Sequence, residues 1–243
     1  MESLLRERLD PGIEVLRLNR PAQRNALDSA TLKLMVGALR ELRTDPALRV
    51  VVLSSTSVLA LCAGIDVAEK LDAEGGMRRM ETFVALYAAL EELPVPLICV
   101  CVGHCIGGGA ELVTSADLRV GATNLGLRFV GARLGVPIGV ARLVPLVGLS
   151  RAKELVFSGH VIRMDEARTL GLLARTAEPE DAEVVALRLA REVAGYSGVS
   201  VRRYKAMFRE FESSHLRVAR ENEILLEFQR SGDGLPQRPS IDA

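Results

Sequence analysis

The sequence predicts an α/β fold, because apolar strands alternate with amphipathic helices along the first half of the chain. Residues 13–18 alternate apolar and polar side chains, as a half-buried strand does, and residues 49–55 hold a continuous apolar run typical of a strand covered on both faces. Asp28 or Ser29 can cap a helix between them. Its apolar stripe consists of Leu32, Met35, Val36, Leu39 and Leu42.

Composition excludes several classes of protein. The 243 residues are 49% apolar and carry 31 basic and 31 acidic side chains, enough for one large core but no electrostatic footprint for nucleic acid or anionic membranes. Residues 93–110 lack charges, but Pro94, Pro96 and several glycines favour a buried strand and turn over a membrane span. The N-terminal segment lacks the apolar core of a signal peptide, so we expect a cytoplasmic protein.

The four cysteines are interpreted as packing residues. Cys99 and Cys101 alternate within the apolar run 97–102, as small buried side chains of a strand do. Cys62 and Cys105 complete the set, but a second pair at zinc-finger spacing is absent. We therefore expect free thiols in a reducing compartment and no metal site.

A glycine turn, Gly103 to Leu112, follows that strand and opens a segment of helical composition. The first amides of a helix lack intrahelical acceptors, so such a turn favours negative charge. Glu111 lies about one helical turn beyond Gly108, which would place a general base beside an oxyanion site. The sequence matches neither the P-loop nor the Gly-x-Gly-x-x-Gly pattern. Tight packing of a strand against a helix is the alternative interpretation.

A second turn, residues 61–67, has a similar double interpretation. It could be a loop in which Asp66 caps the next segment. Alternatively, Gly64 frees the amide of Ile65 to face the same cavity as Gly108, and two amides from two turns complete an oxyanion hole.

These motifs together resemble the enoyl-CoA hydratase/isomerase (crotonase) family. The resemblance rests on motifs in the family's order that cover nearly the whole chain: Asn19-Arg20-Pro21, Asn25-Ala26-Leu27, residues 62–66, 103–112, 143–148, 152–159 and 167–172. It implies a spiral of ββα repeats in residues 1–195 and a C-terminal helical region in 196–243 that packs homotrimers, often paired into hexamers.

The same resemblance implies roles for individual residues. The amides of Ile65 and Gly108 would form the oxyanion hole for a thioester carbonyl, and Glu111 would be the first of the two carboxylates that hydratases use. The substrate would be an acyl-CoA, with no cofactor beyond the coenzyme A that it carries. Contacts to the substrate are implied for Arg24, Ala63, Gly64, Asp66 and Gly107.

The chain departs from the family pattern at the second carboxylate. Aligned from its start, residues 125–135 place Phe129 at that position, and aligned from its end they place Gly131 there. Neither is acidic, whereas the segment carries Arg128 and Arg133. These could hold a substrate carboxylate in bidentate geometry or form surface ion pairs.

We therefore expect hydration of a 2-enoyl-CoA with a single carboxylate. The alternatives are double-bond isomerisation, another acyl-CoA lyase or decarboxylase reaction, and acyl-CoA binding without turnover. Farther along the chain we expect helices at residues 77–93, 150–157, 164–170, 181–194 and 199–230, and a strand at 172–176. Residues 232–243 are rich in Gly and Pro and are expected to be disordered.

Overall fold

The computed structural model describes residues 2–232 and 234–235. Six strands form the larger sheet, in the order β1-β2-β3-β5-β7-β9. They are β1 (Leu4–Leu9), β2 (Ile13–Leu18), β3 (Val50–Ser55), β5 (Leu97–Cys101), β7 (Leu118–Ala122) and β9 (Arg175–Ala177). β1 and β2 pair antiparallel, and every later pair of neighbours is parallel.

A smaller sheet of three parallel strands contains β4 (Ala60–Cys62), β6 (His104–Ile106) and β8 (Gly126–Arg128). Each short strand follows a long one, and a helix follows each short strand. These helices are α2 (Ala73–Glu91), α3 (Gly108–Ser115) and α4 (Gly131–Leu134). Each passage of the chain thus adds one strand to each sheet, which confirms the predicted spiral of ββα repeats.

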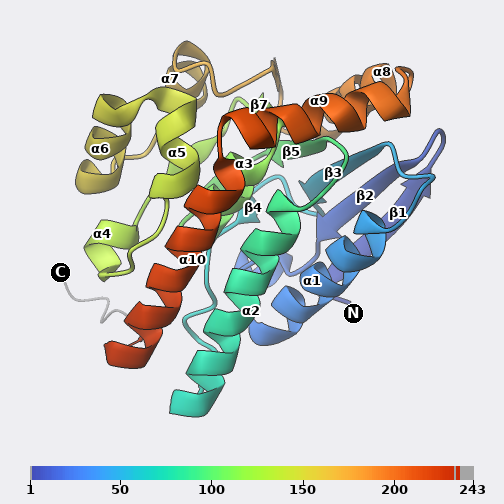
Figure 1. Ribbon diagram of the computed structural model, residues 1–243. Coiled ribbons are helices and arrows are strands. Elements are labelled where there is room, and N and C mark those ends of the chain that lie inside the picture. The colour runs from blue at the N-terminus through green and yellow to red at the C-terminus, as the bar shows by residue number, and fades with distance from the viewer. Residues whose placement is uncertain (1, 233, 236–243) are drawn as a thin grey trace.

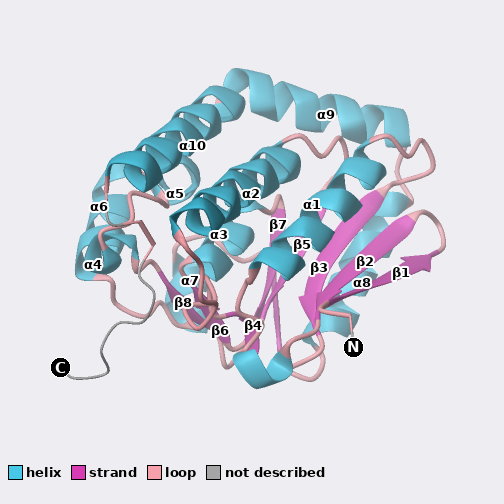
Figure 2. Cartoon of the chain, turned by 90° about the horizontal axis from the view of Figure 1, so that it is seen from below, coloured by secondary structure: helices cyan, strands magenta, loops and turns pink. Residues whose placement is uncertain are grey.

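Helices cover both faces of the large sheet. α1 (Ser29–Arg43), α2 and α3 lie on one face, and α8 (Ala182–Ala194) packs against β3, β5 and β7 on the other (Figure 2). β3 is consequently buried from Val50 to Leu53, as its continuous apolar run predicts. Asp28 caps α1 by accepting a hydrogen bond from the Thr31 amide, which confirms one of the two predicted caps.

The C-terminal half adds six further helices to the described part of the chain (Figure 1). They are α5 (Val140–Val147), α6 (Leu149–Ser158), α7 (Met164–Thr169), α8, α9 (Gly198–Phe211) and α10 (Ser214–Ser231). The prediction of one continuous helix at 199–230 is wrong. Ser213 adopts a left-handed conformation (φ 49°), so α10 leaves the direction of α9 and packs on α2 and α5. This return buries Val218 and Leu225.

Other boundaries also differ from the sequence predictions. β1 was not predicted, because only its first residue, Leu4, is buried. β9 begins three residues later than expected, and α2 begins earlier because the Asp72 side chain caps it. No described helix is long and apolar enough to span a membrane. Disorder was predicted for residues 232–243, and most of these, residues 236–243, lie outside the described residues.

The four cysteines are buried and free, as the packing interpretation predicts. Cys99 and Cys101 lie in β5, whereas Cys62 ends β4 and Cys105 lies in β6. Burial raises the pKa of the Cys62 thiol to about 12. The described residues contain no group of three His, Cys, Asp or Glu side chains placed to hold a metal ion.

Candidate active site

Two glycine turns from successive repeats contact each other at one end of the small sheet. One turn follows β4 and contains Gly64, and the other follows β6 and contains Gly107 and Gly108. Gly64 (φ 96°) and Gly107 (φ 54°) both have left-handed backbone conformations, which glycine adopts at little cost. A Cβ on Gly64 would lie 2.7 Å from the Ile106 carbonyl oxygen and 3.4 Å from the Gly108 nitrogen. The contact between the turns therefore requires glycine.

The Ile65 amide is free to bind a ligand. Leu27 pairs with this segment by donating its N–H to the Gly64 carbonyl (2.7 Å) and accepting from the Asp66 amide (3.0 Å). Because successive amides of an extended segment point to opposite sides, the Ile65 N–H points away from Leu27. Within residues 2–232 and 234–235 it has no acceptor.

The Gly108 amide is free for a different reason. Gly108 is the first residue of α3, so its N–H precedes the intrahelical ladder, whose first bond runs from the Glu111 amide to the Gly107 carbonyl (3.0 Å). Among the described residues no other acceptor reaches it. The partial positive charge of the helix N-terminus adds to this donor. Two unoccupied amides thus meet where the sequence predicts an oxyanion hole.

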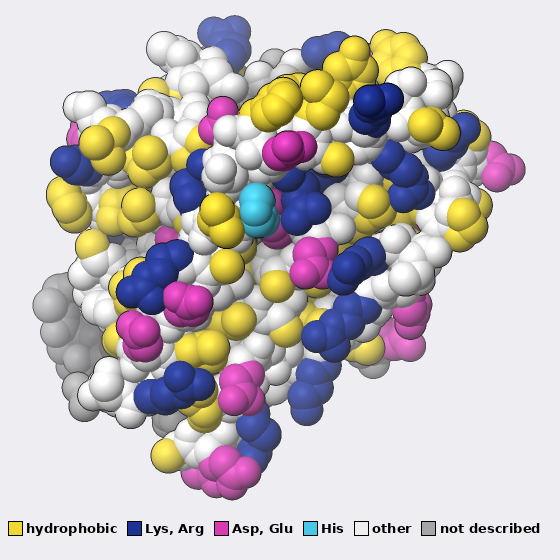
Figure 3. Space-filling view, viewed as in Figure 1, with side chains coloured by type: hydrophobic (Ala, Val, Ile, Leu, Met, Phe, Trp, Pro, Cys, Tyr) yellow, Lys and Arg dark blue, Asp and Glu magenta, His cyan; other side chains and the backbone are white. Residues whose placement is uncertain are grey.

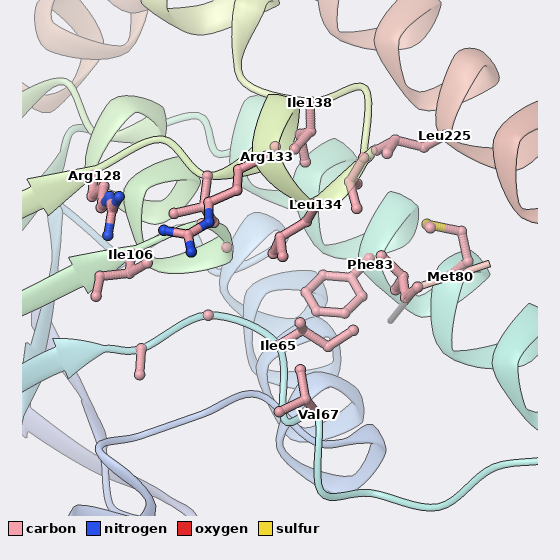
Figure 4. A pocket seen from close by; sticks show the side chains of 18 of the residues that line it. Ile65, Val67, Met80, Phe83, Ile106, Arg128, Arg133, Leu134, Ile138 and Leu225 are labelled. Carbon is pink, nitrogen blue, oxygen red and sulfur yellow. The ribbon is translucent and has the colours of Figure 1, made fainter. Parts of the chain in front are cut away.

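Ile65 and Gly108 line an apolar cavity of about 350 Å³ (Figure 4). Its other walls come from α2, the segment between β8 and α5, and α10. Five of the residues expected at the site line it: Ala63, Gly64, Ile65, Gly107 and Gly108. The structure therefore brings together both predicted oxyanion donors and three of the expected substrate contacts.

Arg24 and Asp66 lie beside this cavity but do not line it. The Arg24 side chain is exposed, and its carbonyl accepts a hydrogen bond from the Ala63 amide at 3.0 Å. The Asp66 carboxylate pairs with Arg20 at 2.9 Å and accepts from the Ala68 amide at 3.0 Å. Both residues hold the turn in place, and their contact with substrate remains a prediction.

Glu111 lies behind the cavity wall and is only 1% exposed. Its Oε2 accepts a hydrogen bond from Nη1 of Arg142 at 3.2 Å, and the Arg142 side chain is itself buried. Burial, followed by the negative charge of Glu221, raises the pKa of Glu111 to about 8, although Arg142 opposes the shift. At neutral pH Glu111 therefore holds its proton, as a general acid does.

Arg142 and Glu221 were missed by the sequence analysis. Glu221 of α10 is 3.5 Å from Arg142 and accepts hydrogen bonds from the backbone amides of three consecutive residues at the start of α5. These donors are Gly139 (3.1 Å), Val140 (2.8 Å) and Ala141 (3.0 Å). No local motif could have identified this carboxylate, because about 80 residues separate it from the helix that it caps.

Tyr87 lies between the cavity and the buried charges. It lines the cavity, and its ring centroid is 4.9 Å from the Cζ atom of Arg142. Burial and the negative charge of Glu111 raise the pKa of the Tyr87 phenol well above its ordinary value. The phenol consequently remains protonated and can donate a hydrogen bond at this wall.

The two candidate positions for a second carboxylate occupy different places. Gly131 lines the cavity, whereas Phe129 is 4% exposed and belongs to the core. A Cβ on Gly131 would lie 2.5 Å from the Val136 carbonyl oxygen, so the backbone closes over this position. None of the described residues lining the cavity is a carboxylate; the charged ones are Arg128 and Arg133.

Comparison with known proteins agrees with this arrangement. The profile of the family described as enoyl-CoA hydratase/isomerase matches residues 8–231. A short-chain-enoyl-CoA hydratase of Clostridium acetobutylicum is 31% identical over 204 residues, which cover 78% of this chain and 75% of that protein. The mitochondrial methylglutaconyl-CoA hydratase of Mus musculus is 33% identical over 190 residues, covering 75% of this chain and 60% of that protein.

Solved structures share the fold. An enoyl-CoA hydratase from Bacillus anthracis superposes with a TM-score of 0.81 at 24% identity, over 97% of this chain and 99% of that one. A monofunctional enoyl-CoA isomerase from M. smegmatis superposes with a TM-score of 0.76 at 26% identity, over 88% of this chain and 95% of that one. With the free amides of Ile65 and Gly108 in the expected place, this chain belongs to the enoyl-CoA hydratase/isomerase family.

Proposed function

We propose that the protein is a hydro-lyase that adds water to a 2-enoyl-CoA. The observation that carries this proposal is the pair of unoccupied amides, Ile65 and Gly108, at the end of an apolar cavity. A thioester oxygen held by both amides would accumulate negative charge in the transition state, where such donors are most effective. Coenzyme A would enter as part of the substrate, without a further cofactor.

The reaction balances with one carboxyl group. Glu111 in its carboxylate form takes a proton from water while the hydroxide oxygen bonds to Cβ, and the electrons of the double bond move to the thioester oxygen. The resulting enolate is held by the two amides. Glu111 then returns the proton to Cα, and the carbonyl re-forms. One residue thus serves as base and then as acid.

Glu111 does not line the cavity, so the proposed reaction requires a movement that brings its carboxyl group into contact with the substrate. The carboxyl lies behind the cavity wall, and Tyr87 both lines the cavity and neighbours Glu111. We propose that substrate binding displaces the Tyr87 ring and opens a contact between the carboxyl and Cα. Because the carboxylate starts the reaction and the pKa of Glu111 is about 8, kcat/KM should rise with pH up to about that value.

The test is the loss of enoyl-thioester absorbance with crotonyl-CoA. Glu111→Gln should lower the rate roughly 10²–10⁴-fold, the range for a general acid or base. Glu223→Gln is the matched control, since Glu223 is an exposed glutamate of α10, and it should leave the rate unchanged. A rate in Glu111→Gln equal to that of the unaltered protein would refute the assigned role of Glu111.

Isomerisation is the second candidate, because a single carboxyl group is also sufficient for it. Moving a double bond requires one group to abstract a proton at Cα and return it at Cγ, so no second carboxylate is needed. One similar solved structure is that of a monofunctional enoyl-CoA isomerase. A 3-enoyl-CoA offered to the protein would gain the absorbance of the conjugated 2-enoyl thioester if this activity is present.

Acyl-CoA binding without turnover is the third candidate. It is favoured by the burial of Glu111 outside the lining of the cavity. A protein of this kind would bind acyl-CoA through the two amides and convert neither crotonyl-CoA nor a 3-enoyl-CoA. Binding measured by calorimetry, together with the absence of both activities, would select this candidate.

We also propose that α9 forms the contact of a homotrimer, which could pair into a hexamer. Tyr204, Phe208 and Phe211 are 62%, 68% and 71% exposed and share one helix face, and apolar side chains gather over α9 in Figure 3. Phe208→Glu should reduce the mass measured by light scattering to that of a monomer. Leu34→Glu, on the exposed side of α1, should not. An unchanged mass for Phe208→Glu would exclude α9 as the contact.

A further inference from the structure

One wall of the apolar cavity carries two guanidinium groups. Arg128 ends β8, and Arg133 lies in the short helix α4 that follows. Figure 4 shows both side chains on the side of the cavity near Ile106, across from Met80 and Phe83 of α2. Two positive charges therefore lie on the wall of a cavity whose other lining residues are mainly apolar.

Neither arginine is neutralised by a carboxylate within the described part of the chain. Nε of Arg128 donates to the Gly159 carbonyl oxygen at 2.5 Å, which fixes the side chain but leaves its charge uncompensated. Arg133 has no hydrogen bond or ion pair among residues 2–232 and 234–235, and its side chain is exposed at the cavity. The interpretation of these arginines as surface ion pairs is thus wrong for the described residues.

Apolar walls strengthen the attraction between such cations and an anion. They exclude water from one side of the guanidinium groups and lower the local dielectric constant. A guanidinium group presents paired N–H donors that match the two oxygens of a carboxylate. The cavity wall therefore complements a carboxylate better than it complements a neutral acyl chain.

The position of Arg128 indicates which part of a substrate would carry the carboxylate. Arg128 pairs with Ile106 across β6 and β8, and its carbonyl accepts a hydrogen bond from the Gly107 amide at 3.0 Å. Gly107 directly precedes the oxyanion donor Gly108. Arg128, Arg133 and Gly108 line the same cavity, so an anion held by the arginines would belong to the acyl part of a substrate whose carbonyl lies at Gly108. The phosphates of coenzyme A are separated from the thioester by the whole pantetheine arm.

We propose that Arg128 and Arg133 bind a carboxylate in the acyl chain, so that the substrate is a CoA thioester of a dicarboxylic acid. The inference rests on the proposed acyl-CoA function of the cavity and specifies its substrate class. Arg128, anchored by Gly159, provides one cation, and the exposed Arg133 provides the other.

The test compares two saturated thioesters that have five acyl carbons and differ at the chain end. Glutaryl-CoA ends in a carboxylate and pentanoyl-CoA in a methyl group, so calorimetric affinities report the carboxylate subsite without any turnover. We expect the protein to bind glutaryl-CoA roughly tenfold or more tightly than pentanoyl-CoA, the scale of one charge-assisted hydrogen bond. Arg133→Gln should remove most of that preference while leaving the affinity for pentanoyl-CoA unchanged.

Two further variants complete the test. Arg128→Gln should also reduce the preference, and Arg168→Gln, at an exposed arginine of α7 outside the cavity, should preserve it. Arg133 holds no other described group, so its variant should fold even if loss of the bond to Gly159 destabilises Arg128→Gln.

Three results would overturn the inference. The first is equal affinity of the unaltered protein for the two thioesters. The second is that Arg133→Gln reduces the affinity for free coenzyme A as much as the affinity for glutaryl-CoA, which would show that Arg133 binds a phosphate. The third is binding of neither thioester, which would overturn the proposed function as well. The first result, in which both thioesters bind equally well, would overturn the carboxylate subsite alone.

Discussion

The proposed oxyanion hole and the buried acid cluster near it are held by different kinds of structure. The hole consists of backbone amides, Ile65 and Gly108, fixed by two glycine turns of successive repeats. The acid cluster consists of side chains from four helices: Tyr87, Glu111, Arg142 and Glu221. The first arrangement depends on backbone geometry and the second on which helices pack together.

This difference determines how each region should respond to substitution. A backbone donor survives a change of its own side chain, so the hole is sensitive to Cβ atoms that would push the turns apart. The acid cluster holds two carboxyl groups around one guanidinium, so it is sensitive to the loss of any one charge.

Arg142→Met should have the largest effect on stability. It leaves Glu111 and Glu221 buried without their shared cation, at a cost of about 3–5 kcal/mol in the free energy of unfolding. The cost should be greater at pH 9 than at pH 6, because Glu111 has a pKa near 8 and is neutral at the lower pH. Urea unfolding at both pH values measures it.

Arg217→Met is the matched control for this change. Arg217 lies on α10 and donates to the Ala141 carbonyl at 3.4 Å, but its side chain is 34% exposed. Its replacement should cost no more than about 1 kcal/mol. A large loss for Arg142→Met that does not vary with pH would contradict the assignment of the charges.

Gly109→Ala and Gly108→Ala should differ in stability, because an added Cβ clashes at Gly109 and fits at Gly108. A Cβ on Gly109 would lie 2.1 Å from the Cys62 carbonyl oxygen, so the variant should lose about 1–3 kcal/mol of stability. A Cβ on Gly108 meets Leu27 at 3.5 Å, an ordinary contact, and should leave the melting temperature nearly unchanged. Equal destabilisation of the two variants would contradict the described packing of Gly109 against Cys62 and of Gly108 against Leu27.

Glu221→Gln should have its clearest effect on the titration of Glu111. The amide oxygen of Gln can still accept hydrogen bonds from the start of α5, but the negative charge that raises the pKa of Glu111 is lost. The groups facing Glu111 would then be Arg142 and Tyr87. We expect the pKa of Glu111 to fall below about 8, so the rising limb of the rate profile should move to lower pH.

The same variant should change the pH dependence of folding. Glu111 binds its proton more tightly in the folded protein than in the unfolded chain, where its pKa is 4.5, so raising the pH from 4.5 to about 8 lowers the stability. Glu221→Gln should reduce that loss. Carbon-13 titration of the Glu111 carboxyl gives the pKa directly, and an unchanged value would refute the coupling.

Individual strands and the free amide of Gly108 could be predicted because their signals are local, whereas the spiral of ββα repeats was implied by the resemblance to the family. A continuous apolar run such as residues 50–53 requires cover on both faces, and a glycine turn before a helix leaves free amides wherever the helix lies. The break at Ser213 could not be predicted in this way. Both sides of it have helical composition, and the left-handed conformation there is stabilised by the burial of Val218 and Leu225 after the reversal.

The sequence by itself determined the α/β class, the two turns and the free amide of Gly108, because the first amides of a helix lack acceptors wherever the helix lies. Only the tertiary structure decided the protonation of Glu111, which depends on Arg142 and on a carboxylate about 80 residues farther along the chain. It also decided that Arg128 and Arg133 face a cavity without carboxylates. Electrostatic interactions act through space, so their partners become known only when the helices are packed.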